Sequence, residues 1–235
     1  MAEIKGILFD KDGTLVDFQQ TWYALADLMA LHAANGNRDR ADALMVKAGY
    51  DYDRHCFRGD SVFAAGTNAD IVALWYPEAD DARRKEMTTY FDTFTAEHGA
   101  LQSVPLPGSQ DAVASLHRAG FRLGVATNDS TSGAEKMLLS LGVAQMFDAA
   151  YGYDAVANPK PAPDTIIAFS DLTGLKPSEI AMVGDNRHDL EMARAGGAGL
   201  AVGVLSGTGT RETLAPMADV ILVSIADLPG YLAGR

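Results

Sequence analysis

The segment Ile4–Leu15, with the sequence IKGILFDKDGTL, carries an apolar run that ends in two aspartates and a glycine. The run over residues 4–9 is apolar enough to form a central strand of a sheet, and Asp10 and Asp12 follow its carboxyl end. Open α/β sheets bind their ligands at this edge. Two carboxylates placed there are suited to holding a divalent cation or to dividing nucleophilic and acid–base roles. A simple aspartate turn after the strand is the structural alternative.

Downstream of Pro107, short apolar runs alternate with helical patterns, which is the rhythm of repeated strand–helix units around a parallel sheet. The expected helices each end at a glycine, the residue that most easily adopts the left-handed conformation of a helix stop. Strands are expected over residues 121–127, 149–153, 180–183, 200–205 and 220–223, and helices over residues 109–119, 131–141 and 162–173.

Residues 17–104 interrupt this pattern and read as helical, for example over residues 22–34 and 81–97. The stretch contains 12 of the 19 aromatic residues, including both tryptophans, which is enough for a small core of its own. We therefore expect two units: an α/β core of residues 1–16 and 105–235, and an inserted helical module of residues 17–104.

The composition of the 235 residues narrows the function. A formal charge of −12 and a pI near 4.7 oppose contact with nucleic acid and with anionic membranes, so a small substrate fits better. Cys56 is the one cysteine, and it predicts neither a disulfide framework nor a zinc site. No apolar run is long enough to span a membrane, and the charged Asp10 comes too early for a signal peptide. We expect a cytoplasmic protein, and the sequence carries no signal for its oligomeric state.

Three further motifs place polar side chains beside predicted strands or helices. GDNRHDL follows an apolar strand and sets Asp185 and Asp189 one helical turn apart, an arrangement that helix capping alone also explains. NPKPAPD holds Lys160 between prolines, where it can point at a fixed anion or simply face solvent. VATND ends a strand with Thr127 and Asn128, which can cradle an anion or merely close the strand.

Taken in order, FDKDGTL, VATN, NPKPAPD and GDNRHDL resemble the four motifs of the haloacid dehalogenase-like hydrolase superfamily, and of its phosphatases in particular. DGTL together with KPAPD is most similar to the phosphoglycolate phosphatase branch. The resemblance covers about residues 4–16 and 105–228, and the insert is similar to that superfamily's cap domain in position and length, much less in sequence. It implies an α/β fold: a doubly wound parallel sheet, the Rossmann-like core, with an inserted α-helical cap domain.

The resemblance also assigns roles to the two aspartates of FDKDGTL. Asp10 is implied to be the nucleophile, which attacks phosphorus and forms an aspartyl-phosphate. Asp12 is implied to protonate the leaving oxygen and then to deprotonate the water that hydrolyses the intermediate. The implied activity is that of a Mg²⁺-dependent phosphatase for a small phosphorylated metabolite, with phosphoglycolate as the first candidate.

A Mg²⁺ site and a phosphoryl site follow from the same resemblance. The Asp10 carboxylate, the Asp12 backbone carbonyl and Asp185 are the implied metal ligands, and Asp189 is implied to support them. Without the cation, an anionic nucleophile would face an anionic phosphate unaided. The groups implied to hold the phosphoryl oxygens as charge builds are the Thr127 hydroxyl, the Asn128 N–H and the Lys160 ammonium.

Two other functions share parts of this motif set. A sugar phosphomutase of the same superfamily carries the same motifs and differs in the details of its cap. A phospho-accepting receiver module also uses a strand-end aspartate, Mg²⁺, threonine and lysine. Receivers lack an insert as long as residues 17–104 after the first motif, and they space their acids differently. The resemblance disfavours a dehalogenase proper, because it ties an aspartate at position 12 to phosphoryl transfer.

Within the insert, residues 54–59 and 65–68 are the candidates for substrate contacts. Arg58 either receives a substrate carboxylate or, more simply, lies exposed on the surface. Cys56 is expected to be a small buried side chain. The aromatic side chains expected in the core of the insert, one of which can line the cleft, are Trp22, Phe63 and Trp75.

The remaining polar residues near these motifs are expected to have no catalytic role. Lys11, between the two aspartates, is expected to face solvent rather than to tune the local field. Residues 207–209 read as a plain loop. The basic side chains expected to be surface or hydrogen-bonded polar groups rather than catalysts are His55, Arg187 and His188.

Overall fold

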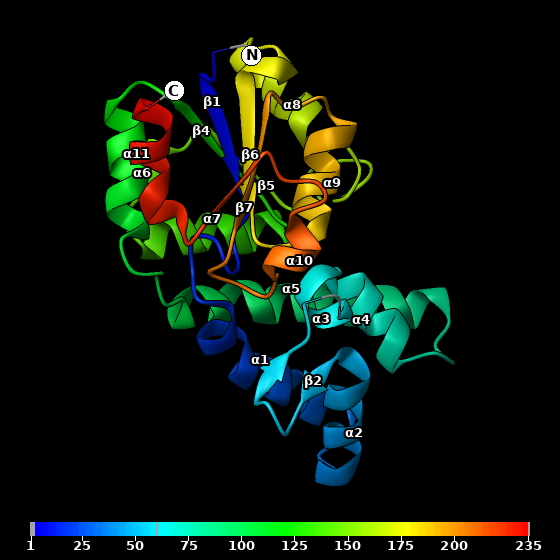
Figure 1. Ribbon diagram of the computed structural model, residues 1–235. Helices are drawn as coiled ribbons and strands as arrows, with labels where there is room; N and C mark the ends of the chain where they lie inside the picture. Colours follow the sequence, from blue (N-terminus) through cyan, green and yellow to red (C-terminus); the bar gives the residue numbers. More distant parts are fainter. Residues whose placement is uncertain (1–2, 60, 235) are drawn as a thin grey trace.

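The structure, a computed structural model, describes residues 3–59 and 61–234 of the chain. A six-stranded sheet with helices on both faces forms one unit, and a group of helices beyond one end of this sheet forms the other (Figure 1). The two ends of the described chain lie at the far end of the sheet unit, away from the inserted helices.

All six strands of the large sheet run parallel, in the order β5-β4-β1-β6-β7-β8. In the central strand β1, Phe9 lies beside Val125 of β4 and beside Val183 of β6, so these three strands end at the same level. The bounds of the strands are β1 (Gly6–Phe9), β4 (Arg122–Ala126), β5 (Ala149–Tyr151), β6 (Ile180–Gly184), β7 (Leu200–Val204) and β8 (Val220–Leu222).

The order of the strands reverses at β1, because the chain continues to β4 and β5 on one side and returns to β6, β7 and β8 on the other. Doubly wound sheets bind their ligands at such a switch point. The predicted doubly wound α/β fold with a helical insertion is therefore confirmed. The predicted strands differ from the observed ones by at most two residues at either end.

Alternate residues of each strand feed two separate apolar cores, because successive side chains point to opposite faces of a sheet. In β1, Ile7 and Phe9 belong to one core, whereas Leu8 belongs to the other. The first core is covered by α6 (Ser109–Arg118), α7 (Thr131–Ser140) and α11 (Leu228–Ala233), and the second by α8 (Asp164–Thr173), α9 (Arg187–Ala195) and α10 (Arg211–Leu214). Short 3₁₀ turns are η1 (Ala144–Met146), η2 (Pro177–Glu179) and η3 (Ile225–Asp227).

Helix α8 begins at Asp164, two residues later than the predicted start. Pro163 takes the position before the first helical residue, where a missing N–H costs nothing because the first N–H groups of a helix have no partner. At the other end, Gly174 has a φ of 71° and ends the helix as predicted.

The inserted residues pack around a third apolar core, which the two faces of the sheet do not share. Within it, Trp75 meets Phe91 edge to face, with ring centroids 5.9 Å apart. The helices of the insert are α1 (Phe18–Ala33), α2 (Arg38–Ala48), α3 (Val62–Ala65), α4 (Asn68–Trp75) and α5 (Asp81–Gln102). A small antiparallel hairpin of β2 (Tyr50–Asp51) and β3 (Cys56–Phe57) was not expected, because two-residue strands are too short to show an alternating pattern.

The chain leaves and re-enters the sheet unit at one place. Val16 and Pro105 form an antiparallel bridge, and the Asp17 N–H donates to the Val104 carbonyl at 2.8 Å. The insert thus starts a few residues after Asp10, at the carboxyl end of β1, and the inserted helices lie beyond this edge of the sheet (Figure 1). Helix α5 then packs along α7 of the core.

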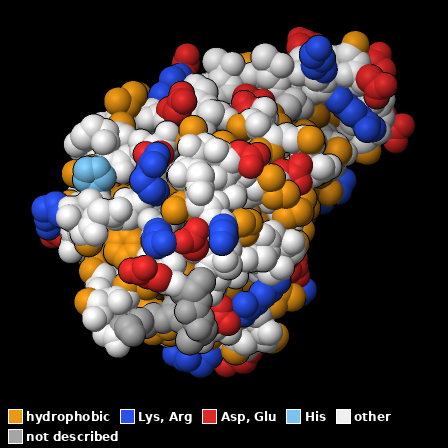
Figure 2. Space-filling model, turned by 90° about the horizontal axis from the view of Figure 1, so that it is seen from above, with side chains coloured by type: hydrophobic (Ala, Val, Ile, Leu, Met, Phe, Trp, Pro, Cys, Tyr) orange, Lys and Arg blue, Asp and Glu red, His pale blue; other side chains and the backbone are white. Residues whose placement is uncertain are grey.

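The end of the sheet unit that faces away from the insert carries a mixed surface. Seen from this side, acidic and basic side chains alternate, with hydrophobic side chains between them (Figure 2). None of the helices in the described part of the chain has the length and apolar character that crossing a bilayer requires.

Phe91 tests the core of the insert, because its side chain is fully buried among helices α1, α4 and α5. Phe91→Ala is expected to lower the free energy of unfolding by about 3–5 kcal/mol, through lost burial and the cavity left behind. Urea unfolding followed by circular dichroism measures this change. Leu101→Ala on the same helix is the matched control; its side chain is 83% exposed, so we expect a change within about 0.5 kcal/mol. Equal effects of the two variants would contradict the described packing.

Candidate active site

Three of the predicted site residues stand at the carboxyl ends of neighbouring strands. Asp10 follows β1, Thr127 follows β4 and Asp185 follows β6, and all three are buried. The Asp10 N–H donates to the Val183 carbonyl at 2.8 Å, which continues the pairing of β1 with β6 up to the site. The parallel register therefore brings together residues that are far apart in the sequence.

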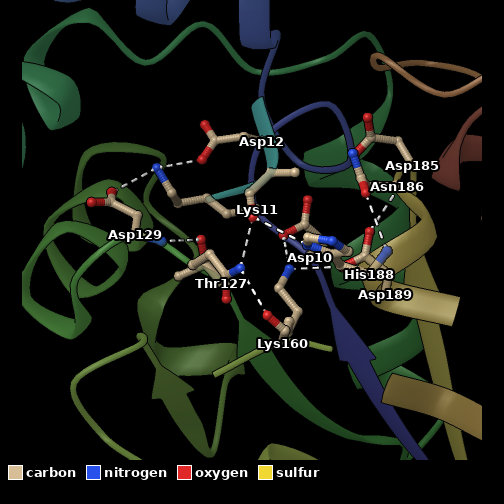
Figure 3. Close-up of polar contacts among 12 residues, drawn as sticks. Asp10, Lys11, Asp12, Thr127, Asp129, Lys160, Asp185, Asn186, His188 and Asp189 are labelled. Atoms are coloured by element: carbon tan, nitrogen blue, oxygen red, sulfur yellow. Dashed lines mark hydrogen bonds and ion pairs between the residues drawn. The ribbon is translucent and has the colours of Figure 1, made fainter. Parts of the chain in front are cut away.

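Lys160 lies between two of the carboxylates. Its ammonium Nζ is 2.6 Å from Asp10 Oδ1 and 2.7 Å from Asp189 Oδ1 (Figure 3). Burial alone lowers the pKa of the ammonium, but the charges of Asp10 and Asp189 outweigh it, so the pKa of Lys160 lies above its usual range. Lys160 is thus a fixed cation and not a solvated lysine of a proline loop.

Asp189 sits one turn into α9 and is fully buried. Besides Lys160, its carboxylate accepts the Asn186 N–H at 2.9 Å, which is the capping interaction expected at a helix start. The sequence left two explanations open for Asp189, helix capping and a place in the site. Asp189 caps α9 and also lies beside Lys160, so the two explanations are compatible.

Asp185 receives its hydrogen bonds from the loop that follows β7. The Thr208 N–H donates to Asp185 Oδ2 at 2.6 Å, and the Thr208 hydroxyl lies 3.1 Å from the same oxygen. A Cβ at Gly207 would overlap this carboxylate, so only glycine lets the loop come so close. Residues 207–209 form a loop, as expected, but the contact of Thr208 with one of the acids of the site was not foreseen.

The carboxylates of Asp10, Asp185 and Asp189 offer oxygen atoms that all lie within 4.8 Å of one another. Burial raises the pKa of Asp10 to about 6, although Lys160 opposes this shift. Burial and the neighbouring charges of Asp10 and Asp189 also raise the pKa of Asp185. Three buried acids with one lysine among them have a deficit of positive charge, and oxygen ligands of this kind suit a small divalent cation. The residues therefore fit a Mg²⁺ site.

Lys11 contradicts its expected place in solvent. Its side chain is buried, and Nζ is 2.8 Å from Asp12 Oδ2 and 2.9 Å from Asp129 Oδ2 (Figure 3). Burial alone lowers the pKa of this ammonium, but the two acids hold it above its usual range. The prediction failed because Asp129 comes from another strand end, and the sequence does not show that the two segments meet.

Asp12 has a second partner, from the insert. The indole Nε1 of Trp22 on α1 donates to Asp12 Oδ1 at 2.5 Å. The Lys11 ammonium lies 4.8 Å from the centre of the same indole ring. All three aromatic residues considered from the sequence pack in the core of the insert, as expected, and two of them, Trp22 and Phe63, also line the cleft.

The strand end after β4 faces the insert. The Thr127 hydroxyl accepts the Asp129 N–H at 3.0 Å. The Asn128 side chain donates to the Ala65 carbonyl at 2.8 Å and to the Lys160 carbonyl at 3.1 Å. Asn128 Oδ1 is buried and has no hydrogen-bond partner among the described residues. Both residues line the cavity, and their contact with a phosphoryl group stays a prediction.

Contacts from the insert close over this edge of the sheet. The Ala65 carbonyl also lies 3.2 Å from His188 Nδ1, and the Asn186 side chain donates to the Gly59 carbonyl at 2.7 Å. His188 is thus a hydrogen-bonded polar residue, as expected. Farther out, the Tyr153 hydroxyl donates to Asp92 of α5 at 2.5 Å.

A cavity of about 60 Å³ lies between the carboxylates and the insert. Of the two ranges predicted to contact the substrate, residues 65–68 line this cavity, whereas none of residues 54–59 is among its lining residues and Arg58 is exposed. Cys56 is only half-buried, so the expectation of a buried side chain is wrong. The side chains of the insert that form the apolar wall of the cavity are Phe18, Trp22, Phe63 and Ile71.

Sequence analysis missed Asp129 and Thr208, and it named Trp22 as a side chain that can line the cleft but missed its contact with Asp12. Asp129 is the last residue of the motif VATND. An acid beside a turn expected to bind an anion needs a cationic partner, and this was an available signal. Thr208 stands between two glycines, which often mark a close backbone approach. Trp22 had no comparable signal, because an aromatic residue on a helix more often packs in a core than contacts a carboxylate.

The comparison with known proteins agrees with the motif order. The family model of haloacid dehalogenase-like hydrolases matches residues 4–197. The phosphoglycolate phosphatase of Salmonella typhimurium is 30% identical over an alignment of 240 residues, and this alignment covers 97% of this chain and 92% of that protein. The phosphoglycolate phosphatase of Escherichia coli is 29% identical, over 96% of this chain and 91% of that protein.

Solved structures share the fold over the whole chain. A predicted phosphatase from Clostridium acetobutylicum superposes with a TM-score of 0.76 at 21% identity, with complete coverage of both chains. A predicted phosphoglycolate phosphatase from Haemophilus somnus has a TM-score of 0.73 at 23% identity, over 98% of this chain and 99% of that one. With the matched family model and the related enzymes, the chain belongs to the haloacid dehalogenase-like hydrolases, in their phosphoglycolate phosphatase-like branch, and is a phosphoric monoester hydrolase.

Proposed function

We propose that the chain hydrolyses a small phosphate monoester with the help of Mg²⁺, through an aspartyl-phosphate on Asp10. The observation that carries this proposal is the cluster of Asp10, Asp185 and Asp189 at the switch point of the sheet, with Lys160 bound to two of them. A nucleophile, a cation site and a fixed positive charge thus occupy one place. These are the groups that phosphoryl transfer needs.

In the first half of the reaction, an Asp10 oxygen attacks phosphorus and the bond from phosphorus to the ester oxygen breaks. Asp12 donates a proton to the departing oxygen, so the product leaves as an alcohol. Lys160 already faces Asp10 at 2.6 Å and stabilises the added charge on the phosphoryl oxygens. Thr127 and the backbone N–H of Asn128 complete the phosphoryl site.

In the second half, Asp12 takes a proton from water, which attacks the phosphorus of the aspartyl-phosphate. The bond from phosphorus to Asp10 breaks, and phosphate and free Asp10 result. When bound by Asp10, the Asp12 carbonyl and Asp185, Mg²⁺ supplies positive charge against the phosphoryl group. Asp189 supports this set by holding Lys160 in place at 2.7 Å.

Residues 17–104 act in this proposal as a cap domain over the core formed by residues 1–16 and 105–235. The apolar side chains of the cap lie on the other side of the cavity from the carboxylates, where the leaving group of a bound ester would be. The cavity between the cap and the core, of about 60 Å³, favours a small substrate. Because the relatives are phosphoglycolate phosphatases, phosphoglycolate is the first ester to test.

Asp10→Asn should reduce turnover by more than about 10³-fold, because an amide cannot form the acyl-phosphate. Hydrolysis of a small ester and trapping of ³²P on the denatured protein measure the two consequences. The exposed Asp111→Asn, on α6, is the matched control and should retain parent activity and labelling. Substantial turnover by the Asp10 variant would exclude the covalent mechanism.

Mg²⁺ should stabilise the folded chain, because the cation compensates buried carboxylates that the unfolded chain exposes to water. At a concentration of about 100 times its Kd, binding adds about 2.7 kcal/mol to the free energy of unfolding. Thermal unfolding at increasing Mg²⁺ concentration measures this gain without any substrate.

The same titration tests the two acids of GDNRHDL. Asp185→Asn should weaken Mg²⁺ binding more than Asp189→Asn, because both oxygens of Asp189 have donors in the protein, whereas the hydrogen bonds of Asp185 go to Oδ2. Asp111→Asn again serves as the control. The reverse order would mean that Asp189 is the direct ligand.

A panel of esters tests the role of the cap. Phosphoglycolate, a hexose phosphate, a mononucleotide and p-nitrophenyl phosphate should all be cleaved faster than a phosphoserine protein, because the closed cap excludes large substrates. Values of kcat/KM with Mg²⁺ and with EDTA give the ranking. A protein substrate at the top of this ranking would contradict the proposed role of the cap, and a sugar bisphosphate formed from the hexose phosphate would indicate a mutase.

A further inference from the structure

We infer that Trp22 and Lys11 are positioning residues that together orient the Asp12 carboxylate. The inference rests on the proposed function, in which Asp12 transfers protons. It gives a role to two side chains besides Lys160 and the four aspartates of the motifs. Neither residue is proposed to touch the reacting atoms. Both are proposed to act through Asp12.

Each oxygen of Asp12 has its own donor. Trp22 Nε1 donates to Oδ1 at 2.5 Å, and Lys11 Nζ lies 2.8 Å from Oδ2. A carboxylate held by one donor can still rotate about its side-chain bonds. With a donor on each oxygen, the plane of the Asp12 carboxylate has a defined direction, which proton transfer to a bound ester requires.

The two donors are themselves held in place. Lys11 is buried, and its second ion pair, with Asp129 at 2.9 Å, keeps the ammonium from following Asp12 if that side chain moves. Trp22 is 6% exposed and packs edge to face on Phe63, with ring centroids 5.9 Å apart. Lys11 also lies over the Trp22 ring at 4.8 Å, so the two donors contact each other as well as Asp12.

The donors come from different parts of the chain. Lys11 belongs to the turn after β1, whereas Trp22 belongs to helix α1 of the insert. Lys11 and Asp129 both belong to the sheet unit, so residues of that unit alone orient one oxygen of Asp12. The other oxygen is oriented only while α1 lies over this edge of the sheet, so the insert contributes directly to the position of the proton donor.

Trp22→Phe is the test, because phenylalanine keeps an aromatic side chain against Phe63 and removes the N–H. If Trp22 positions Asp12, the loss is greatest for an ester whose leaving group needs the proton. We expect kcat/KM for phenyl phosphate to fall about 10- to 100-fold, and that for p-nitrophenyl phosphate to fall much less. Both esters place an aromatic ring on the leaving oxygen, so the comparison isolates the acidity of the leaving group.

A double-mutant cycle separates positioning from a structural role. In an Asp12→Asn chain, Trp22→Phe should have no further effect on the rate of phenol release from phenyl phosphate in a single turnover. Lys11→Met should show the same selective loss for phenyl phosphate, and Lys11→Arg should restore part of it by keeping a cation between Asp12 and Asp129. Circular dichroism and thermal unfolding identify any variant that does not fold.

Fluorescence gives a measurement independent of catalysis. In a Trp75→Phe chain, Trp22 is the remaining tryptophan, and Asp12→Asn should shift its emission because the acceptor of its N–H changes. An equal fall for both esters in Trp22→Phe, or an undiminished effect in the Asp12→Asn chain, would overturn the inference. A parent chain that cleaves no ester would instead refute the proposed function, and the fluorescence shift would still report the contact itself.

Discussion

The site depends on the burial of several carboxylates at one edge of a parallel sheet, with few positive charges to compensate them. Two lysines take part, and each lies between two acids from different segments: Lys160 between Asp10 and Asp189, and Lys11 between Asp12 and Asp129. An unpaired buried charge is costly, so these bridges determine where the segments can lie. The two lysine bridges thus stabilise the contacts between these segments and also hold the acids of the candidate active site in place.

Asp185 is the acid that this scheme leaves without a lysine. Its hydrogen bonds come from the neutral groups of Thr208, in a loop that glycine allows to approach closely. A cation is the natural partner for such a carboxylate, and Asp10 is near enough to share it. The proposed place of Mg²⁺ is therefore the place where the buried carboxylates lack positive charge.

The place of insertion, between β1 and α6, gives the inserted helices their position. Since the chain departs a few residues after Asp12 and returns through the Val16–Pro105 bridge, helix α1 starts beside the strand end. Contacts through Ala65 and Gly59 then hold the insert over the end of the sheet. The place where the insert begins thus puts its helices beside the acids, and the apolar side chains of these helices form another wall of the cleft.

The sequence by itself determined the strands of the large sheet, the helices between them and the main acids. Strand and helix periodicity is local, and a polar residue directly after an apolar strand must lie at the sheet edge, so Asp10, Thr127 and Asp185 could be placed without coordinates. Long-range neighbours could not be placed in this way. Whether Lys11 faces solvent, whether Thr208 reaches Asp185 and whether Trp22 contacts Asp12 depend on which distant segments meet. Burial and hydrogen bonding in the tertiary structure decide those contacts, and no short stretch of sequence encodes them.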